Sequence, residues 1–360
     1  MKFLDEFRSG ENARRMVQAI RSASVSRRLT LMEVCGTHTM AIARHGIKRL
    51  LPETISLVSG PGCPVCVTPN PFVDRAAALA GLPGILIATF GDMMRVPGSS
   101  TSLEQERAAG RDVRIVFSTL DALLLAASHT DRKIVFLGVG FETTAPTVAV
   151  SILEARKRKL NNYFVLSSHK VMPPAMDAIS KGDVHVDGYL CPGHVSAIIG
   201  TQSYENLVRR YGIGCVVSGF EPLDILRSIF LLVRQSEENR PRVEVEYTRA
   251  VKPEGNPKAM AVLNEVFEPT DAEWRGLGTI PQSGLKIRDA FSDWDAECRI
   301  PVEVEPPREP EGCRCGDVLC GRLKPQECPL FGKVCTPETP VGACMVSSEG
   351  TCAAQFRFGE

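Results

Sequence analysis

Cysteine is the residue type in this chain that most clearly carries chemistry. Seven of the thirteen cysteines fall within the last fifty residues. Four of these are spaced C-x14-C-x6-C-x16-C, with three more between them: Cys313, Cys328, Cys335 and Cys352, interleaved with Cys315, Cys320 and Cys344. Thiolates at this density select iron–sulfur clusters, zinc or copper(I) over magnesium or calcium. The sequence therefore predicts a metal site near its end and, in a separate CPVC segment, a thiol pair.

The spacing of the tail cysteines favours an iron–sulfur cluster. Structural zinc sites usually take ligands as pairs two to four residues apart, and the gaps here are much longer. A cluster needs only four thiolates that converge in space, which irregular loops can supply. Zinc and a set of disulfides remain alternatives, and spacing does not exclude Cys315, Cys320 or Cys344 as ligands.

The thiol pair lies in the segment Gly-Pro-Gly-Cys-Pro-Val-Cys, where Cys63 and Cys66 have CxxC spacing. Two such sulfurs can form a small disulfide ring or bind one metal, and a nearby helix start would lower a thiol pKa. Redox chemistry is therefore predicted. The alternatives are two buried cysteines in a proline-rich turn, or half of a zinc site.

Cys35 is a candidate metal ligand or nucleophile because it precedes His38 by three residues. A loop or first helical turn at this position would favour the thiolate. A buried cysteine with a hydrogen-bonded histidine nearby is the alternative.

Three further side chains are candidates for proton transfer. Glu142 and Glu221 each follow Gly-Phe after an apolar run, and His194 follows Cys-Pro-Gly. Helix capping is the alternative role for the two acidic residues. Cys215 is expected to serve packing, and packing is an equal alternative for Cys191. Neither a GxGxxG fingerprint nor a Walker lysine motif is present, so nucleotide binding is not expected.

Nearly all these motifs directly follow a candidate β-strand, and the strands alternate with helical patterns. The predicted strands are Leu29–Val34, Ile55–Val58, Ile85–Phe90, Val113–Phe117, Lys133–Val139, Phe164–Ser167, Val186–Leu190, Cys215–Ser218 and Val243–Tyr247. Helices are predicted over Thr144–Lys159 and Pro222–Gln235. This alternation is typical of parallel sheets, whose ligands bind beyond the carboxyl ends of the strands. We therefore expect the motifs to meet across one cleft between two domains.

The predicted fold class is α/β, with two doubly wound parallel-sheet domains and a loop-rich, cysteine-rich iron–sulfur domain. The first α/β domain is expected at residues 31–131, with Cys35 and the CPVC pair, and the second at residues 132–255. Residues 256–360 would form the iron–sulfur domain, with residues 1–30 packed on it as one or two helices.

The composition fits a chain of two or three domains. At 360 residues it exceeds the usual limit of a single core, and 44% of its residues are hydrophobic. The 42 basic and 42 acidic side chains balance, so neither nucleic acid nor a membrane surface is an expected partner. No apolar run approaches a membrane span, and no signal peptide is evident. A cytoplasmic location with reduced thiols is predicted, rather than secreted disulfides.

Taken together, these motifs resemble the hydrogenase maturation factor HypD family, nearly from end to end. The resemblance rests on Cys35-Gly36-Thr37-His38, Gly60 to Cys66, Gly140 to Pro146, Pro192-Gly193-His194-Val195-Ser196, and the tail segment Gly342 to Gly350. It implies a scaffold on which iron acquires two cyanides and one carbon monoxide before transfer to the large subunit of a nickel–iron hydrogenase. HypC and HypE are the implied partners.

The resemblance also implies roles for individual cysteines. Cys35 would be the thiolate that binds iron together with a HypC cysteine, and Cys63 and Cys66 would be the redox pair. The [4Fe-4S] ligands would be Cys313, Cys328, Cys335 and Cys352. Glu142, His169 and His194 are second candidates for positioning or proton transfer. A stand-alone iron–sulfur thiol/disulfide oxidoreductase is the alternative function.

Overall fold

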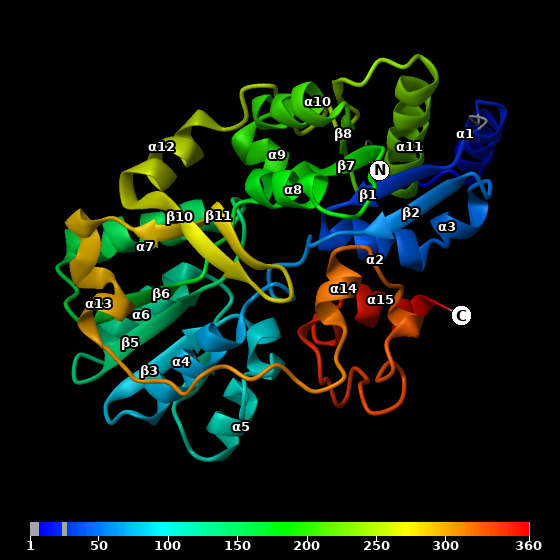
Figure 1. The fold of residues 1–360 in the computed structure, drawn as a ribbon. Helices are drawn as coiled ribbons and strands as arrows, with labels where there is room; N and C mark the ends of the chain where they lie inside the picture. Colours follow the sequence, from blue (N-terminus) through cyan, green and yellow to red (C-terminus); the bar gives the residue numbers. More distant parts are fainter. Residues whose placement is uncertain (1–6, 24–26, 360) are drawn as a thin grey trace.

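The computed structural model describes residues 7–23 and 27–359, which form two parallel β-sheets covered by helices and a third, cysteine-rich region of loops and short helices (Figure 1). The predicted fold class is confirmed. Among the described residues, no helix is both long and apolar enough to cross a membrane.

The first sheet has five parallel strands in the order β2-β1-β7-β8-β9. Their bounds are β1 (Leu29–Glu33), β2 (Ile55–Ser59), β7 (Gly188–Pro192), β8 (Gly214–Ser218) and β9 (Val243–Val245). Strands β7 and β8 are buried along their whole length, as expected for a parallel sheet with both faces covered. Strands β2 and β9 are the edges.

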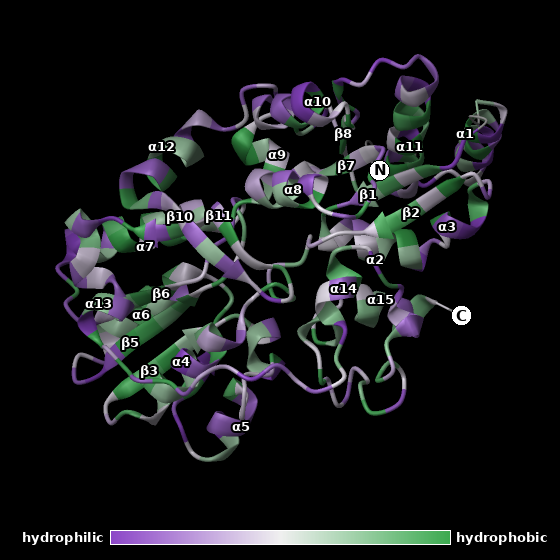
Figure 2. Ribbon diagram, viewed as in Figure 1, coloured by the Kyte–Doolittle hydropathy of each residue, from purple (hydrophilic) through white to green (hydrophobic). Residues whose placement is uncertain are grey.

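The second sheet has four parallel strands in the order β4-β3-β5-β6. Their bounds are β3 (Ile85–Thr89), β4 (Val113–Ile115), β5 (Lys133–Gly138) and β6 (Tyr163–Ser167). The nine predicted strands all exist, with ends displaced by two residues at most. The apolar runs from which the strands were predicted form the buried centres of these strands. Figure 2 shows β3 and β5 in the green of hydrophobic residues.

Helices cover the faces of both sheets. In chain order, the longer ones between the strands are α2 (Gly36–Arg44), α4 (Asn70–Gly81), α5 (Leu103–Ala108), α6 (Thr119–Ser128), α7 (Ala145–Arg158), α8 (Met172–Lys181), α9 (Gly193–Ile199), α10 (Glu205–Tyr211) and α11 (Pro222–Glu237). Short helical turns are α3 (Ile47–Leu50), η2 (Gly91–Arg95) and η3 (Gln202–Tyr204). The predicted helices over Thr144–Lys159 and Pro222–Gln235 correspond to α7 and α11.

The chain does not complete one sheet before starting the next, which corrects the expected boundary near residue 131. Strands β1 and β2 join β7, β8 and β9, whereas β3 and β4 join β5 and β6. Pairing of β1 with β7 sets Leu31 opposite Gly188, across more than 150 residues. Neighbouring parallel strands look alike in sequence, so their order along the chain does not reveal which sheet each one joins.

The N-terminal helix also differs from expectation. Helix α1 (Gly10–Ser22) packs against α11 of the first sheet rather than on the cysteine-rich region. Its Ile20 is fully buried in the core that contains Ile225 and Leu226 of α11. The apolar side of α1 is thus buried against α11. Residues 1–6 and 24–26, also expected on the third domain, lie outside the described residues.

A β-hairpin lies where no regular structure was predicted. Strands β10 (Phe267–Trp274) and β11 (Gly278–Ile287) pair antiparallel, with a bulge between Thr270 and Ala272. Trp274 is fully buried, and its Nε1–H donates to the Ser283 hydroxyl at 2.8 Å. Strand β11 packs against α8. Strand β10 was not predicted because its proline and acidic residues interrupt the alternation of apolar and polar residues that is typical of a strand.

The remaining elements are one helix before the hairpin, two short helices after it, and the short helices of the cysteine-rich region. They are α12 (Pro257–Val266), η4 (Asp289–Trp294), α13 (Ala296–Arg299), α14 (Cys315–Leu319), η5 (Pro325–Glu327), η6 (Ala343–Met345) and α15 (Thr351–Phe358). An extended segment near residue 308 runs along α4, where the Asn70 side chain donates to the Arg308 carbonyl at 2.8 Å. Helix α15 packs against α2, which brings the last cysteines beside the first sheet (Figure 1).

Candidate functional site

Cys35 lies at the carboxyl end of β1 and is the N-cap residue of α2. Its thiol is buried, with 8% of the residue exposed, and its backbone N–H donates to Glu33 Oε2 at 3.1 Å. Burial raises the pKa of this thiol to about 12, although backbone N–H groups of His38 and Thr37 bond to the sulfur and oppose the change. The thiolate therefore needs a cation to stabilise it, as a bound metal would.

His38 is buried three residues further along α2. Its Nε2–H donates to the Gly219 carbonyl at 2.9 Å, and Nδ1 has no hydrogen-bond partner among the described residues. Burial lowers the pKa of the imidazole to about 4. His38 is therefore neutral near pH 7, with an unused acceptor at Nδ1.

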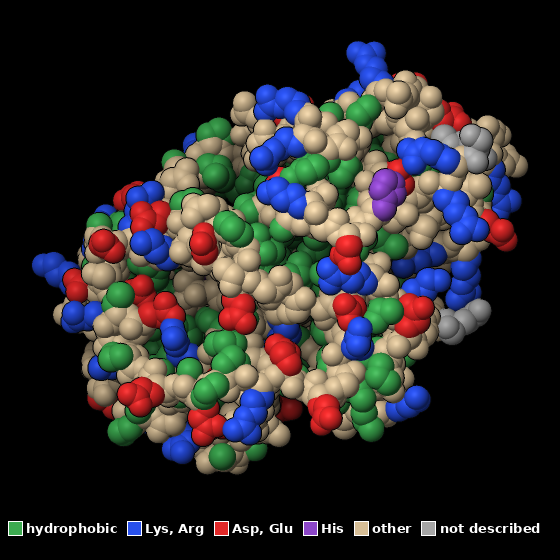
Figure 3. Space-filling model, in the orientation of Figure 1, with side chains coloured by type: hydrophobic (Ala, Val, Ile, Leu, Met, Phe, Trp, Pro, Cys, Tyr) green, Lys and Arg blue, Asp and Glu red, His purple; other side chains and the backbone are tan. Residues whose placement is uncertain are grey.

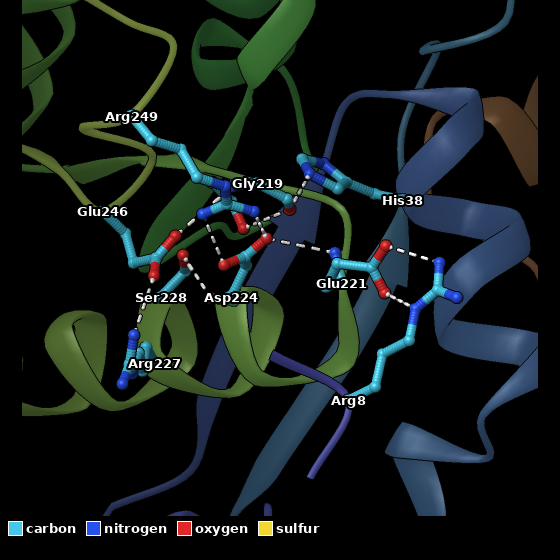
Figure 4. Close-up of polar contacts among 10 residues, drawn as sticks. Arg8, His38, Gly219, Glu221, Asp224, Arg227, Ser228, Glu246 and Arg249 are labelled. Atoms are coloured by element: carbon cyan, nitrogen blue, oxygen red, sulfur yellow. Dashed lines mark hydrogen bonds and ion pairs between the residues drawn. The ribbon is translucent and has the colours of Figure 1, made fainter. Parts of the chain in front are cut away.

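The loop after β8, which holds His38, is fixed by ion pairs (Figure 4). The Asp224 carboxylate accepts two bonds from Arg249, at 2.5 and 2.9 Å, and one from the backbone N–H of Glu221 at 3.1 Å. Glu221 in turn binds Arg8 through two bonds, at 2.6 and 2.8 Å, and is the N-cap of α11. Arg8 lowers the pKa of the Glu221 carboxyl, so this residue has the capping role rather than that of a proton donor.

His194 joins the same group from the carboxyl end of β7. Its ring stacks on the Phe220 ring, with 4.1 Å between the centroids. The His38 ring contacts the same Phe220 ring, at 4.8 Å between centroids. Burial lowers the pKa of His194, and the Glu349 carboxylate acts in the opposite direction. The structure thus brings two of the predicted histidines together with Cys35.

The tail segment Ser347–Glu349 links this group to the second sheet. The Thr37 hydroxyl donates to Glu349 Oε1 at 2.6 Å, and the Glu349 N–H donates to the Ser347 hydroxyl at 3.3 Å. That hydroxyl donates to Asp92, which follows β3, at 2.8 Å. The expected meeting of strand ends from both sheets is therefore mediated by the tail.

Glu349 is a site residue that the sequence reasoning missed. A Cβ at Gly36 would lie 2.6 Å from the Glu349 Cβ, so the tail rests directly on the start of α2. The sequence did contain a clue, because Glu349 is an acidic residue within the tail segment Gly342 to Gly350. In that segment only Cys344 was considered as a candidate.

The CPVC loop rests on the backbone of Cys35. A Cβ at Gly62 would lie 2.1 Å from the Cys35 nitrogen, and the Gly36 N–H donates to the Gly62 carbonyl at 3.0 Å. Cys63 and Cys66 are both buried, and the Cys66 N–H donates to the Cys63 sulfur at 3.3 Å. The predicted thiol pair is therefore adjacent to the predicted iron ligand.

On its other side, Cys66 faces the tail cysteines. Burial raises the pKa of the Cys66 thiol, and the nearby thiols of Cys63, Cys344 and Cys315 add to this effect. A Cβ at Gly350 would lie 2.2 Å from the Cys344 carbonyl oxygen and 3.1 Å from the Cys66 sulfur. Glycine at this position lets the thiol pair approach the tail.

Six tail cysteines surround one small cavity. They are the four predicted cluster ligands, Cys313, Cys328, Cys335 and Cys352, together with Cys315 and Cys344. Cys320 lies apart, on a different cavity beside Arg322. The central cavity measures about 10 Å³, and the sulfurs of Cys344 and Cys352 are 3.0 Å apart.

This donor set fits an iron–sulfur cluster. Among the described residues, no three potential ligands surround a single metal position. Six soft sulfurs with no carboxylate lining the cavity suit iron–sulfur chemistry or zinc, and exceed the four ligands that either needs. Gly342 lies against this set, since a Cβ there would be 2.8 Å from the Cys313 sulfur.

Glu142 and His169 lie at the carboxyl ends of β5 and β6 and contact other groups. Glu142 Oε1 accepts the Met172 N–H at 2.9 Å, Oε2 has no partner among the described residues, and burial raises the pKa to about 7. His169 Nδ1 lies 3.0 Å from the Ser167 hydroxyl, and burial lowers its pKa to about 3. Their hydrogen bonds are made within the second sheet's own loops and α8, apart from the Cys35 group.

Comparison with known proteins places this arrangement in a family. The family model described as "HypD: Hydrogenase formation hypA family" matches residues 11–359. Hydrogenase maturation factor HypD of Cupriavidus necator and that of Azotobacter vinelandii are each 46% identical to the chain, over 100% of it and 97% of their own length. The Rhodobacter capsulatus HypD is 44% identical over 100% of the chain and 98% of its own length. The chain belongs to the HypD family.

Proposed function

We propose that this protein is a maturation factor for nickel–iron hydrogenases. Its substrate is an iron ion that acquires two cyanides and one carbon monoxide, and its partners are HypC and HypE. The completed iron unit then passes to the hydrogenase large subunit. The names of the full-length relatives support the hydrogenase connection, and the environment of Cys35 supports the iron-binding role.

Contact between the Gly62 backbone and Cys35 is the observation that carries this proposal. This contact places the buried Cys35 thiol, whose thiolate form needs a nearby cation, next to the buried dithiol of Cys63 and Cys66. Low-spin iron with strong-field diatomic ligands suits such a soft thiolate. Burial also keeps water from an iron ion that carries cyanide and carbon monoxide. A cysteine of HypC would supply the second thiolate.

The tail cysteines would hold a [4Fe-4S] cluster, with Cys313, Cys328, Cys335 and Cys352 as ligands. Such a cluster supplies one-electron transfer when bound. Cys63 and Cys66 form the neighbouring two-electron couple, since their oxidation to a disulfide releases two electrons and two protons. Contact of the Cys66 sulfur with Gly350, and its proximity to Cys344, support electron exchange between the two centres.

The histidines beside Cys35 would position groups and transfer protons. His38 is neutral and presents Nδ1 as an acceptor, because Nε2–H is committed to Gly219. His194 is more accessible and lies on the Phe220 ring, where it could meet an incoming partner. Glu142 accepts the Met172 N–H instead and is proposed as a buried structural carboxyl.

The stand-alone oxidoreductase is the second candidate function. Its support is the CxxC pair beside the cysteine cavity. Both sulfurs are almost completely buried, with 3% and 0% exposure for Cys63 and Cys66, so an external protein disulfide has no direct access. This burial favours an internal relay. Turnover of a disulfide substrate by the isolated chain would favour the oxidoreductase instead.

Anaerobic co-purification with HypC, followed by infrared spectroscopy, tests the first proposal. We expect bands of iron-bound carbon monoxide and cyanide in the wild-type complex and none in Cys35→Ala. Cys298→Ala is the matched control, since it removes an exposed cysteine outside the site and should retain the bands. Bands of full intensity in Cys35→Ala would exclude Cys35 as the iron ligand.

A further inference from the structure

A groove of about 820 Å³ lies between the first sheet and the cysteine-rich region. Its floor is strand β2 over its full length, Ile55–Ser59. One wall is formed by α2 and α3, and the other by residues 321–327 and the end of α15. Figure 3 shows Lys and Arg side chains gathered on the side of the molecule where Figure 1 places β2 and α3.

Strand β2 presents an unpaired edge to this groove. Its only neighbour in the sheet is β1, and the Gly60 N–H donates to the Glu33 carbonyl at 2.7 Å. Alternate residues of a parallel strand bond to the same neighbour, so the N–H groups of Leu57 and Ser59 point away from β1. Neither forms a backbone bond with another residue in the described part of the chain. An edge of this kind is a template for an added strand.

Two lysines line the same groove, which also includes Glu327. Lys48 and Lys324 line opposite walls, and neither forms an ion pair with any residue that the structure describes. Desolvation by the groove walls lowers the pKa of the Lys48 ammonium, although the residue is partly exposed to solvent. The Glu33 carboxylate raises this pKa, and the nearby Lys324 lowers it. Cations on two walls of one groove attract a carboxylate that enters it. Arg322, by contrast, is already paired with Asp183 at 2.8 Å.

The walls of the groove belong to the elements that carry the proposed metal ligands. Helix α2 begins immediately after Cys35, and Thr39 on it lines the groove. Helix α15 begins at Thr351, which also lines the groove and directly precedes Cys352. An occupant would therefore touch the supports of both the iron site and the cluster site.

We propose that this groove docks an extended, carboxylate-bearing segment of a protein partner, which adds a strand to the free edge of β2. The inference rests on the proposed function, because the partner is one of the two maturation partners, HypC or HypE. Backbone bonds to Leu57 and Ser59 hold the segment, and Lys48 and Lys324 bind its carboxylate.

Amide hydrogen exchange of β2 tests this directly. It is measured on the full chain alone, with HypC, with HypE and with both. We expect one partner to slow exchange at Leu57 and Ser59 by at least about tenfold. Lys324→Glu should weaken binding of that partner by at least about tenfold in calorimetric titration. Lys258→Glu, an exposed charge reversal on α12, should leave the affinity unchanged.

Three results would overturn the inference. The first is unchanged exchange at both amides in a complex that carries the infrared bands, which leaves the proposed function standing. The second is protection by inorganic phosphate without either partner, which would make the groove an anion site. The third is failure of both partners to bind, which would overturn the proposed function as well. Circular dichroism of Lys324→Glu separates lost binding from lost folding, since its side chain is exposed.

Discussion

Replacing Glu142 by glutamine should change how the stability of the protein depends on pH. Glu142 is 3% exposed, and burial raises the pKa of its carboxyl from 4.5 to about 7. Below pH 4.5 the carboxyl is protonated in both the folded and the unfolded chain. Between pH 4.5 and 7 the unfolded chain loses this proton while the folded chain keeps it, so stability falls. Above pH 7 the loss is complete.

The size of the loss follows from the two pKa values. At about 1.4 kcal/mol per pKa unit, a change from 4.5 to about 7 corresponds to roughly 3.5 kcal/mol. Glutamine does not titrate, and its carbonyl can still accept the Met172 N–H that now bonds to Oε1. The free energy of unfolding of Glu142→Gln, relative to wild type, should therefore rise by about 2.5 kcal/mol between pH 5 and pH 8, since part of the loss has already occurred at pH 5.

Thermal unfolding of both proteins at pH 5, 6, 7 and 8 measures this difference. At roughly 2 °C per kcal/mol, the melting temperature of Glu142→Gln should gain about 5 °C on wild type across this range. The raised pKa values of Glu33 and Glu246 affect both proteins equally and cancel. Glu311→Gln, at an exposed carboxyl, should follow wild type at every pH. Parallel curves for wild type and Glu142→Gln would refute the assignment of Glu142 as a buried, desolvated carboxyl.

Three further predictions concern the contacts around the cysteines. Gly62→Ala should lower stability by about 1–3 kcal/mol and abolish the infrared bands, because its Cβ would meet the Cys35 nitrogen at 2.1 Å; retained bands would contradict this contact. Thr37→Val should cost about 1–3 kcal/mol in thermal unfolding through the lost bond to a carboxylate, whereas Thr37→Ser should cost much less. Cys328→Ala should lose the cluster's iron and sulfide by chemical analysis, and Cys320→Ala should keep them, since Cys328 lines the cavity and Cys320 does not.

Local patterns predicted the elements well. Strands such as β5 and β8 are continuous apolar runs between turn residues, and burial in a parallel sheet requires such runs. Hairpin β10–β11 was not predicted because its first strand, Phe-Glu-Pro-Thr-Asp-Ala-Glu-Trp, has only its two end residues buried and carries a proline. Its stability comes from the buried Trp274 and from packing on α8, which are tertiary effects.

Long-range arrangement was harder to predict than the elements. No local signal assigns β1 to the same sheet as β7, because both are short apolar strands followed by a glycine-containing loop. The contact between Cys35 and Gly62 depends on the pairing of β1 with β2, which places their carboxyl ends side by side. Glu349 could be identified only once the tail was seen to rest on α2.

The central claim is that one chain holds an iron substrate at Cys35 and, across the dithiol, a cluster at the tail cysteines. Mössbauer spectroscopy of the iron-57-labelled complex with HypC tests both sites in one sample. We expect separate signals from low-spin iron with diatomic ligands and from a [4Fe-4S] cluster. Cys35→Ala should lose only the first signal, and Cys328→Ala should lose the cluster signal. A Cys35→Ala complex that keeps both signals, or a wild-type complex without cluster iron, would contradict the account.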